Sequence, residues 1–394
     1  MQNGAMGMRT ATVTVLLFVA LIAAQPMAVV ADEPLSNVSL GTLEEKLLAD
    51  AAGGSLGAHG WSDAAVIAGG VNDSAELATQ RERLDRLAAL LRSRIEPDAS
   101  DAQRAAIVLR VLHREVWTGE YRVSCNSLRD SLADGDFNCV TATLLFATLC
   151  ERCDCTVQIM ATPRHVFCRV AGEPPLDIEP TCANWFEAND AARQEAIATR
   201  KSTENSPKSP DIPREISFVQ LLARVYYNRG VALLEQRNFA PAVAMLNASL
   251  RLDEQQPPAR DNRLAAFNNW ALAKCDAGRG AEAAELLARA RRLDPRYAPL
   301  LANEVYVHRQ WIVQLCERGE FARAAAVLAE AHARRPDVPL FDTGRQTVYL
   351  AWSQSLVRAE QPREAAAVIQ CGLALFPDCS QLRNLQRDLT RGNF

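Results

Sequence analysis

The chain has 394 residues, of which 43 are lysine or arginine, 47 are aspartate or glutamate, and 48% are apolar. This balance is typical of a globular protein and excludes a disordered or fibrous chain. The length predicts two or three domains, because a single hydrophobic core seldom grows beyond about 250 to 300 residues. The net charge of −4 is spread along the chain, so nothing indicates a nucleic-acid partner or an anionic membrane surface.

Residues 1–31 have the layout of a secretory signal peptide. Arg9 precedes an uncharged run from Val13 to Ala24, and small residues follow up to Ala31. The apolar run is about a dozen residues long, whereas a membrane-spanning helix needs about 20. We therefore expect cleavage after Ala31, export to the periplasm or the medium, and no membrane span after signal cleavage.

Residues 32–190 are predicted to form the first domain, which begins with a helical N-terminal extension. Between 40 and 112 the apolar residues recur at steps of three and four, and Asp73 or Ser74 is placed to cap one helix of this region. A second helix fits Gln103 to Val116.

Cys139 occupies a position that favours a reactive thiol. Gly135 and Asp136 form a turn signal before it, and apolar residues recur at helical spacing after it. Cys139 is therefore expected on the first turn of a helix, where unpaired amides and the helix dipole favour a thiolate. The β-branched and apolar residues 156–161 predict that a strand follows this helix.

His165 begins the next predicted strand, and a proline-containing turn at 172–175 reverses the chain after it. The prolines must lie in the turn, because they cannot take part in a β-ladder. A turn centred on Gly172 places Glu179 opposite His165, about 5 Å away on the same face. Asp177 is the competing carboxylate, but it faces His165 only if the turn shifts back by one residue and the prolines enter the strand.

A cysteine at a helix start, a histidine at a strand start and a carboxylate on the adjoining strand follow the order of papain-like enzymes. The segments "GDFNC", "PRHVF" and "IEPT" resemble the Cys, His and Asp-Pro-Thr motifs of the transglutaminase-like superfamily, over residues 120–185. The resemblance implies an α+β transglutaminase-like (papain-like) fold. It also implies that Cys139 is the nucleophile, His165 the base and Glu179 the third member of a triad.

Two positions depart from the family pattern. Glu179 replaces the usual Asp, and Phe167 stands where many members have Trp after the His. For the oxyanion of an acyl-transfer intermediate, we expect the Cys139 amide as one donor and Asn126 or Asn138 as the second.

The chain has eleven cysteines, an odd number, so at least one thiol is expected to be unpaired if the others form disulfides. Cys150, Cys153 and Cys155 resemble half of a zinc site, but no second Cys or His pair stands at ligand spacing. A local disulfide or buried thiols are therefore favoured over a metal. We expect no metal and no organic cofactor.

Residues 191–214 are rich in Lys, Ser, Asn and Pro and are predicted to form a linker. Residues 215–394 then repeat with a period of 41, because three sets of positions recur at that interval. The sets are Ala242, Ala283, Ala324 and Ala365; Leu246, Leu287, Leu328 and Ile369; and Leu252, Leu293, Arg334 and Leu375.

These repeats predict stacked antiparallel helix pairs that share a core. The segments "YYNRGVALLEQRNFAPAVAMLNASLRLD" and "NNWALAKCDAGRGAEAAELLARARRLDP" resemble the tetratricopeptide repeat, over residues 223–377 in four units. The resemblance implies an all-α superhelical repeat domain that binds a protein or peptide ligand. The period exceeds the usual 34 or so, which predicts longer helices or a longer link between pairs.

Two functional hypotheses follow. In the first, the protein is an exported transglutaminase-like thiol enzyme that acts on peptide or amide bonds through a thioester on Cys139, as a peptidase, amidase or acyl transferase. In the second, the fold is catalytically inactive and the protein is an adaptor or scaffold that works through its repeats.

Overall fold

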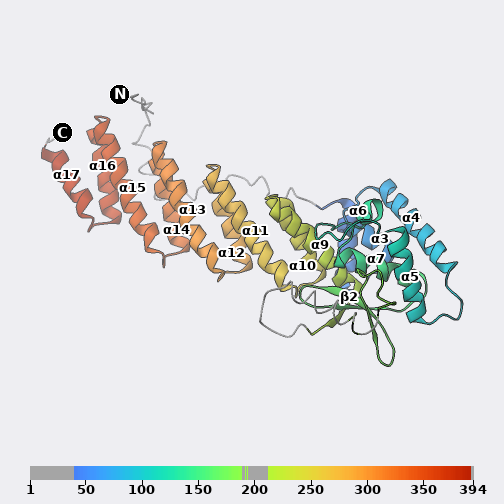
Figure 1. Ribbon diagram of the computed structural model, residues 1–394. Coiled ribbons are helices and arrows are strands. Elements are labelled where there is room, and N and C mark those ends of the chain that lie inside the picture. Colours follow the sequence, from blue (N-terminus) through green and yellow to red (C-terminus); the bar gives the residue numbers. More distant parts are fainter. Residues whose placement is uncertain (1–39, 189–190, 192, 194–211, 392–394) are drawn as a thin grey trace, which may run out of the picture. The chain divides into compact units, whose positions relative to one another are not determined.

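The computed structural model describes residues 40–188, 191, 193 and 212–391, so the signal-like segment at 1–31 lies outside the described residues. The chain forms two compact units, of which one spans Leu35–Ala266 and the other begins at Phe267. Both are mostly helical, and the first also holds a small sheet (Figure 1). Among the helices described, none is long and apolar enough to cross a membrane.

The first unit begins with helices, as the sequence predicts. Asp73 caps the longest of them, because its side chain accepts a hydrogen bond from the Glu76 amide at 2.7 Å. Ser100 caps the next helix through a capping box with Gln103. The elements before the sheet are α2 Thr42–Asp50, η1 Ala51–Gly53, α3 Trp61–Ala68, α4 Ser74–Arg92, α5 Asp101–Glu115, α6 Leu128–Asp134 and α7 Cys139–Arg152.

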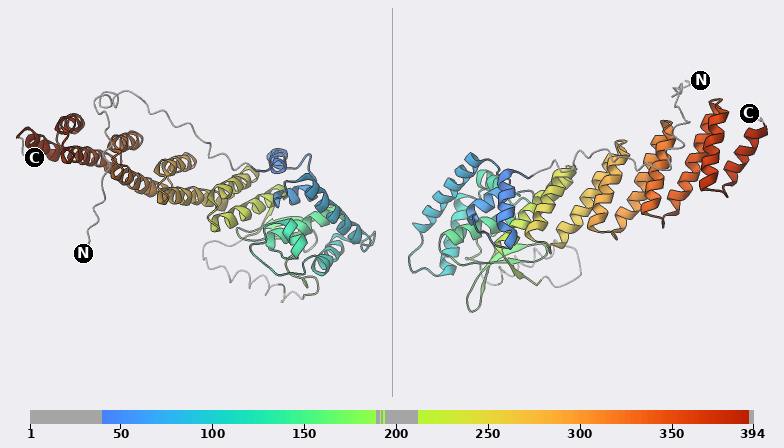
Figure 2. Two further views of the ribbon diagram at one scale, coloured as in Figure 1. Left: turned by 90° about the horizontal axis from the view of Figure 1, so that it is seen from above. Right: turned by 180° about the vertical axis from the view of Figure 1, so that it is seen from behind.

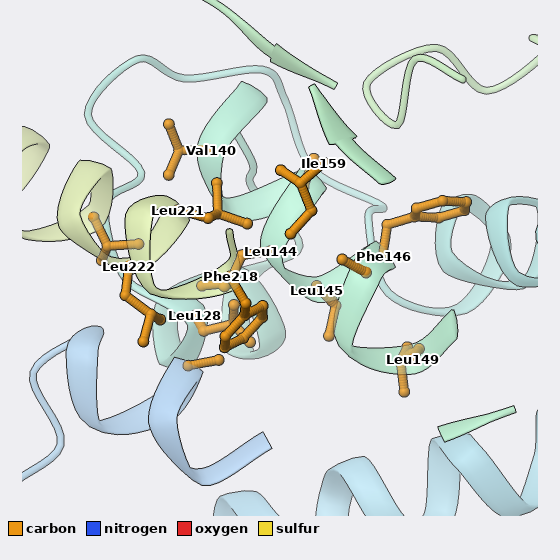
Figure 3. Close-up of a cluster of buried hydrophobic side chains, with 14 of the residues drawn as sticks. Leu128, Val140, Leu144, Leu145, Phe146, Leu149, Ile159, Phe218, Leu221 and Leu222 are labelled. Atoms are coloured by element: carbon orange, nitrogen blue, oxygen red, sulfur yellow. The ribbon is translucent and has the colours of Figure 1, made fainter. Parts of the chain in front are cut away.

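Helix α7 is the centre of this unit. Every residue from Val140 to Cys150 is buried. The helix contacts α3, α4, α5, α6, α9 and strand β2, and Figure 3 shows its side chains within a cluster that also contains residues from the sheet and from α9. A helix that is apolar on all sides is stable only when it is buried on all sides. The residue at its N-terminus, Cys139, is therefore held by a rigid element.

The sheet is antiparallel, with strand order β3-β2-β1-β4. Strand β2 packs against α7, which places the start of this strand beside the buried helix. Its strands are β1 Gln158–Ala161, β2 Val166–Val170, β3 Leu176–Ile178 and β4 Arg214–Ile216.

The first helix pair of the predicted repeats, α9 Phe218–Glu235 and α10 Phe239–Leu252, belongs to the first unit. Phe218 stacks on Trp61 with ring centroids 4.0 Å apart. Arg229 donates to the buried carboxylate of Glu44 at 2.6 Å, which ties α9 to α2. The two compact units therefore divide within α11, because β4, α9 and α10 complete the core of the first unit. Most of the linker predicted at 191–214 lies outside the described residues.

The helices that follow confirm the 41-residue period. The second helix of each pair begins at position 239, 280, 321 or 362. The extra length lies in the first helix of each later pair, which has 20 residues against 14 in the second. From α12 onward the helices alternate in direction and stack side by side (Figure 2). Their bounds are α11 Pro257–Asp276, α12 Gly280–Leu293, α13 Ala298–Glu317, α14 Phe321–Arg334, α15 Pro339–Arg358, α16 Pro362–Leu375 and α17 Ser380–Arg391.

Two of the three predicted sets of equivalent positions form the core between these helices. The alanine set and the Leu/Ile set are buried throughout: Ala242, Ala283, Ala324, Ala365, Leu246, Leu287, Leu328 and Ile369. The third set differs, because Leu293 is 45% exposed and Leu375 is 48% exposed. The third set therefore marks where the second helix of each pair ends, and only Leu252 of the first pair is a core residue.

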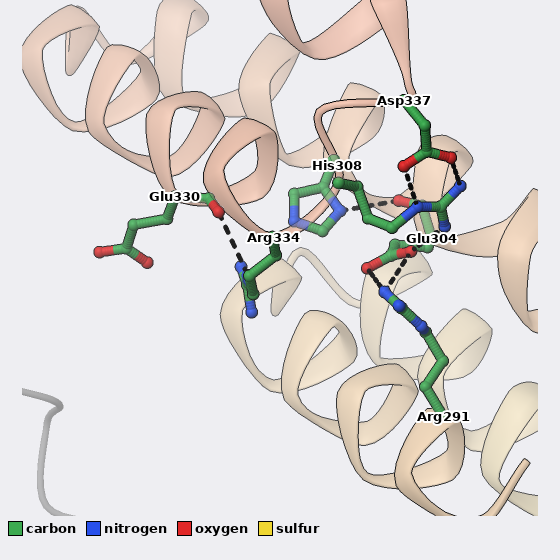
Figure 4. Close-up of polar contacts among 7 residues, drawn as sticks. Arg291, Glu304, His308, Glu330, Arg334 and Asp337 are labelled. Atoms are coloured by element: carbon green, nitrogen blue, oxygen red, sulfur yellow. Dashed lines mark hydrogen bonds and ion pairs between the residues drawn. The ribbon is translucent and has the colours of Figure 1, made fainter. Parts of the chain in front are cut away.

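A buried carboxylate links three elements of the second unit. Glu304 on α13 accepts hydrogen bonds from Arg291 of α12 at 2.8 and 2.9 Å, and from Arg335 at 3.1 Å (Figure 4). Arg335 lies just after α14 and also binds Asp337 at 2.8 Å. The charge of Glu304 is therefore compensated in the interior, as burial of a carboxylate requires.

The turn inside each helix pair offers a stability test. Positions 237, 278, 319 and 360 all have a positive φ, between 56° and 75°, but only two of them are glycine. An L-residue with a side chain costs about 1 kcal/mol in this left-handed conformation. We expect Glu360→Gly to stabilise the protein by about 0.5 to 1 kcal/mol and Gly319→Ala to destabilise it by about 1 kcal/mol. Urea unfolding of both variants measures this, and a shift of the same sign in both would contradict it.

Candidate active site

Cys139 is the first residue of α7, as predicted. Asn138 precedes it as the N-cap, and its side-chain oxygen accepts hydrogen bonds from the amides of Val140 and Thr141, both at 2.9 Å. These bonds fix the first turn of the helix. They leave the Cys139 amide as a helix-start N–H without an intrahelical acceptor.

His165 lies immediately before β2, at the end of the loop that connects it to β1. Two hydrogen bonds with Thr162 close this loop: the His165 amide donates to the Thr162 hydroxyl at 3.1 Å, and the Thr162 amide donates to the His165 carbonyl at 2.9 Å. The imidazole is hydrogen-bonded to Glu179, and Cys139 is close enough to raise the pKa of His165. The structure thus brings the three predicted site residues together.

Glu179 reaches the histidine by a different strand register from the one predicted. Strands β2 and β3 pair Arg169 with Asp177 and Cys168 with Ile178, so the turn is centred on Glu173 and not on Gly172. Glu179 is consequently a diagonal neighbour of His165, and not its directly opposite partner. Its Oε2 still lies 2.7 Å from the imidazole Nε2, because a shift of two residues keeps the side chain on the same face.

Asp177, the competing carboxylate, has a different partner. It faces Arg169 across the strand pair and accepts hydrogen bonds from its guanidinium, one of them at 3.1 Å. Asp177 and Glu179 are therefore two residues apart in the sequence but differ in environment. Asp177 forms an ion pair with Arg169 near the surface, whereas Glu179 is buried against the histidine.

The contacts of His165 change its proton affinity. Burial by itself lowers the pKa of this imidazole, but the hydrogen bonds to Cys139 and Glu179, together with their negative charges, outweigh it and raise the pKa to about 9. The histidine is therefore an imidazolium at neutral pH. A cation between a thiolate and a carboxylate is the charge arrangement that a cysteine nucleophile needs.

Only one of the two suggested side chains remains available to stabilise an oxyanion. Asn138 is buried, and its amide nitrogen donates to the carbonyls of Cys125 at 2.7 Å and Val123 at 3.1 Å. Both N–H groups of the Asn138 side chain are thus used within the protein, so the prediction that Asn138 donates to the oxyanion is wrong. Asn126 is half-buried; its side-chain oxygen accepts a hydrogen bond from the Asn138 amide at 3.3 Å, and its amide nitrogen donates one at 3.4 Å to the Asn228 carbonyl. The Cys139 amide and the second N–H of Asn126 are therefore the candidate donors.

The other cysteines contrast with Cys139. All eleven are free thiols, and no group of His, Cys, Asp and Glu among the described residues is placed to hold a metal ion. Cys150 and Cys155 touch at the end of α7, where the Cys155 amide donates to the Cys150 carbonyl at 2.9 Å. Burial raises the pKa of seven thiols and makes them poor nucleophiles: Cys125, Cys150, Cys153, Cys168, Cys275, Cys316 and Cys371.

Two residues at the site were missed by the sequence analysis. Thr181 donates its hydroxyl to the second carboxylate oxygen of Glu179 at 2.7 Å, and thereby orients it. The "IEPT" motif contains this threonine, so its role was open to prediction. Arg224 on α9 donates to the Thr162 carbonyl at 2.9 Å. It lies far along the chain, in a helix assigned to the repeats, and no local pattern marks it.

Two hollows in the described surface lie elsewhere, lined by residues of 96–110 and of 83–116, and neither includes a triad residue. The candidate site therefore rests on the side-chain arrangement around His165. No family model matches the chain, and no curated protein or solved structure gives a match either.

Proposed function

We propose that this protein is a thiol enzyme of the transglutaminase-like type, which cleaves or exchanges amide bonds through a thioester on Cys139. The observation that carries the proposal is the position of the His165 imidazole, which is hydrogen-bonded to the buried Glu179 and lies close enough to Cys139 for that side chain to raise its pKa. The helix start at Cys139 adds partial positive charge to the same place.

In the first half of the reaction, His165 holds the proton of the thiol and the Cys139 sulfur attacks the carbonyl carbon of the amide. The carbonyl oxygen becomes an oxyanion, which the Cys139 amide is placed to stabilise. The imidazolium then gives its proton to the leaving nitrogen. The C–N bond breaks, an amine departs and a thioester remains on Cys139.

In the second half, His165 takes a proton from water or from an acceptor amine, which attacks the thioester carbonyl. The C–S bond breaks, and the thiolate pairs again with the imidazolium. Glu179 keeps one tautomer and one ring orientation throughout. Water yields a carboxylic acid, whereas an amine yields a new amide, so the same residues serve hydrolysis and transfer.

Two other parts of the chain bear on where this enzyme would act and on what it would bind. The signal-like segment at 1–31 supports export, and the helix pairs after Phe267 support a protein or peptide ligand of a tetratricopeptide-type array. We propose that the array holds the protein substrate or a partner of the enzyme.

Hydroxylamine trapping tests the proposed activity. A mixture of glutamine-containing peptides is incubated with the purified protein and hydroxylamine, and hydroxamates are detected by mass spectrometry. We expect hydroxamates with the natural protein and none with Cys139→Ala, because hydroxylamine intercepts the thioester. Cys182→Ala is the matched control, since it removes a partly exposed thiol of the same unit.

Either of two results would overturn the proposal. Hydroxamates that persist in Cys139→Ala would place the chemistry elsewhere. A folded protein that forms no hydroxamate, and whose Cys139 alkylates no faster than a simple thiol, would favour the inactive scaffold.

A further inference from the structure

Arg224 brings a positive charge to the proposed active site from outside the motif region. It lies on α9, and its Nη2 donates to the Thr162 carbonyl at 2.9 Å. Thr162 is the residue that closes the loop of His165 through two hydrogen bonds. Arg224 is therefore attached directly to the loop that carries the proposed base, and it is close enough to Cys139 for that side chain to act on the pKa of Arg224.

Within the part of the chain that the structure describes, this guanidinium forms no hydrogen bond or ion pair with a carboxylate, although Asp253 attracts its charge from a greater distance. Its one hydrogen bond uses a single N–H of the five that an arginine carries. The side chain is half-buried, and burial lowers the pKa of Arg224, with repulsion from Arg214 acting in the same direction. A half-buried arginine is ordinarily paired, because desolvation of its charge costs free energy.

A second arginine lies on the same side of the site. Arg214 begins β4 and pairs with Ala161 in the ladder, one residue before Thr162. It is exposed. The two arginines thus place positive charge next to the loop of His165.

We propose that Arg224 binds a carboxylate of the acyl substrate, close to the amide bond that Cys139 attacks. The inference rests on the proposed function and names its substrate class: peptides that carry a negative charge beside the reacting carbonyl. Arginine suits this role because its planar fork matches a carboxylate and stays charged at every relevant pH. The bond to Thr162 fixes the guanidinium before substrate arrives.

The carboxylate has two chemical sources, an acidic side chain and a free chain terminus. Three small ligands separate them: N-acetylglutamate α-amide carries only the side-chain carboxylate, N-acetylglutamine only the terminal one, and N-acetylglutamine amide neither. Each is tested for its ability to protect Cys139 from iodoacetamide. We expect protection by one of the two acids, reduced in Arg224→Gln, and none by the neutral amide.

Alkylation with a charged and a neutral reagent measures the effect of Arg224 directly. Iodoacetate carries a carboxylate and iodoacetamide does not, so the ratio of their rate constants at Cys139 reports a carboxylate site beside the sulfur. Arg224→Gln is expected to lower this ratio roughly five- to tenfold at low salt, and Arg224→Lys to lower it less. The Cys139 peptide is followed by mass spectrometry.

Arg251→Gln is the matched control, because Arg251 lies on the same unit but pairs with Glu45 at 2.9 Å. Its ratio should equal that of the natural protein. An unchanged ratio in Arg224→Gln would overturn the inference, and so would an equal slowing with both reagents, which indicates a purely structural role. The ratio is defined even in a protein that turns over no substrate, so failure of this inference is distinguishable from failure of the proposed function.

Discussion

Replacing His165 with alanine is expected to slow the alkylation of Cys139 by iodoacetamide about tenfold at about pH 6. A simple thiol is only about 0.3% ionised there, and pairing with an imidazolium is expected to give a gain in the thiolate population. An ion-paired thiolate is a weaker nucleophile, and this offsets much of that gain. The net increase in the alkylation rate of Cys139, about tenfold, is what His165→Ala is expected to remove.

The difference in Cys139 alkylation rate between the natural protein and His165→Ala should depend on pH. His165 keeps its proton in the folded protein up to a pKa of about 9, whereas a free imidazole loses it near 6.5. The advantage of the natural protein is therefore expected to disappear as the pH rises through about 9, where the imidazolium loses its proton. Above that value the two proteins should react at similar rates.

His59→Ala is the control for this experiment, because His59 lies in the same unit but pairs with Asp50 at 2.9 Å. It should leave the Cys139 rate unchanged at every pH. The thiols with raised pKa provide a further reference, since Cys150 and Cys168 are buried and should not react in the folded protein. A rate that is the same with and without His165 would contradict the proposed ion pair.

Local signals in the sequence were sufficient to predict the start of α7 and the identity of the three clustered residues. The turn at Gly135 and the apolar run after Cys139 predict a helix start, which depends on neighbouring residues alone. The choice of Glu179 over Asp177 depended on the exclusion of prolines from the ladder, and that constraint held. The register itself was wrong by two residues, because the exact centre of a turn is set by its backbone geometry, which residue types specify only weakly.

Tertiary packing, and not the sequence pattern, determines which unit helix α9 belongs to. The 41-residue period groups α9 with the later helices, and the period is real. Yet Phe218 stacks on Trp61, and Arg229 binds the buried Glu44, so this helix completes the first core. A repeat pattern records which residues face a neighbouring helix, but not which neighbour they face. Arg224 was missed for the same reason.

Replacing Glu179 with glutamine is expected to lower the pKa of His165 from about 9 by one to two units and to reduce hydroxamate formation by roughly 100-fold or more. The carboxylate is buried and charged, and its bond to the imidazole Nε2 measures 2.7 Å. Glutamine keeps the shape and one hydrogen bond but removes the negative charge that stabilises the imidazolium. The pH profile of Cys139 alkylation reports the pKa, and trapping reports turnover.

Asp177→Asn provides the closest available comparison, because the two carboxylates are two residues apart and both substitutions remove one charge. Asp177 pairs with Arg169 at the surface, so its loss should leave the pKa of His165 and the trapping rate within about twofold of the natural protein. Equal effects of the two variants would mean that the site responds only to net charge. A large effect in Glu179→Gln alone would show that the buried contact with His165, across a diagonal of the strand pair, is what maintains the charge on the imidazole.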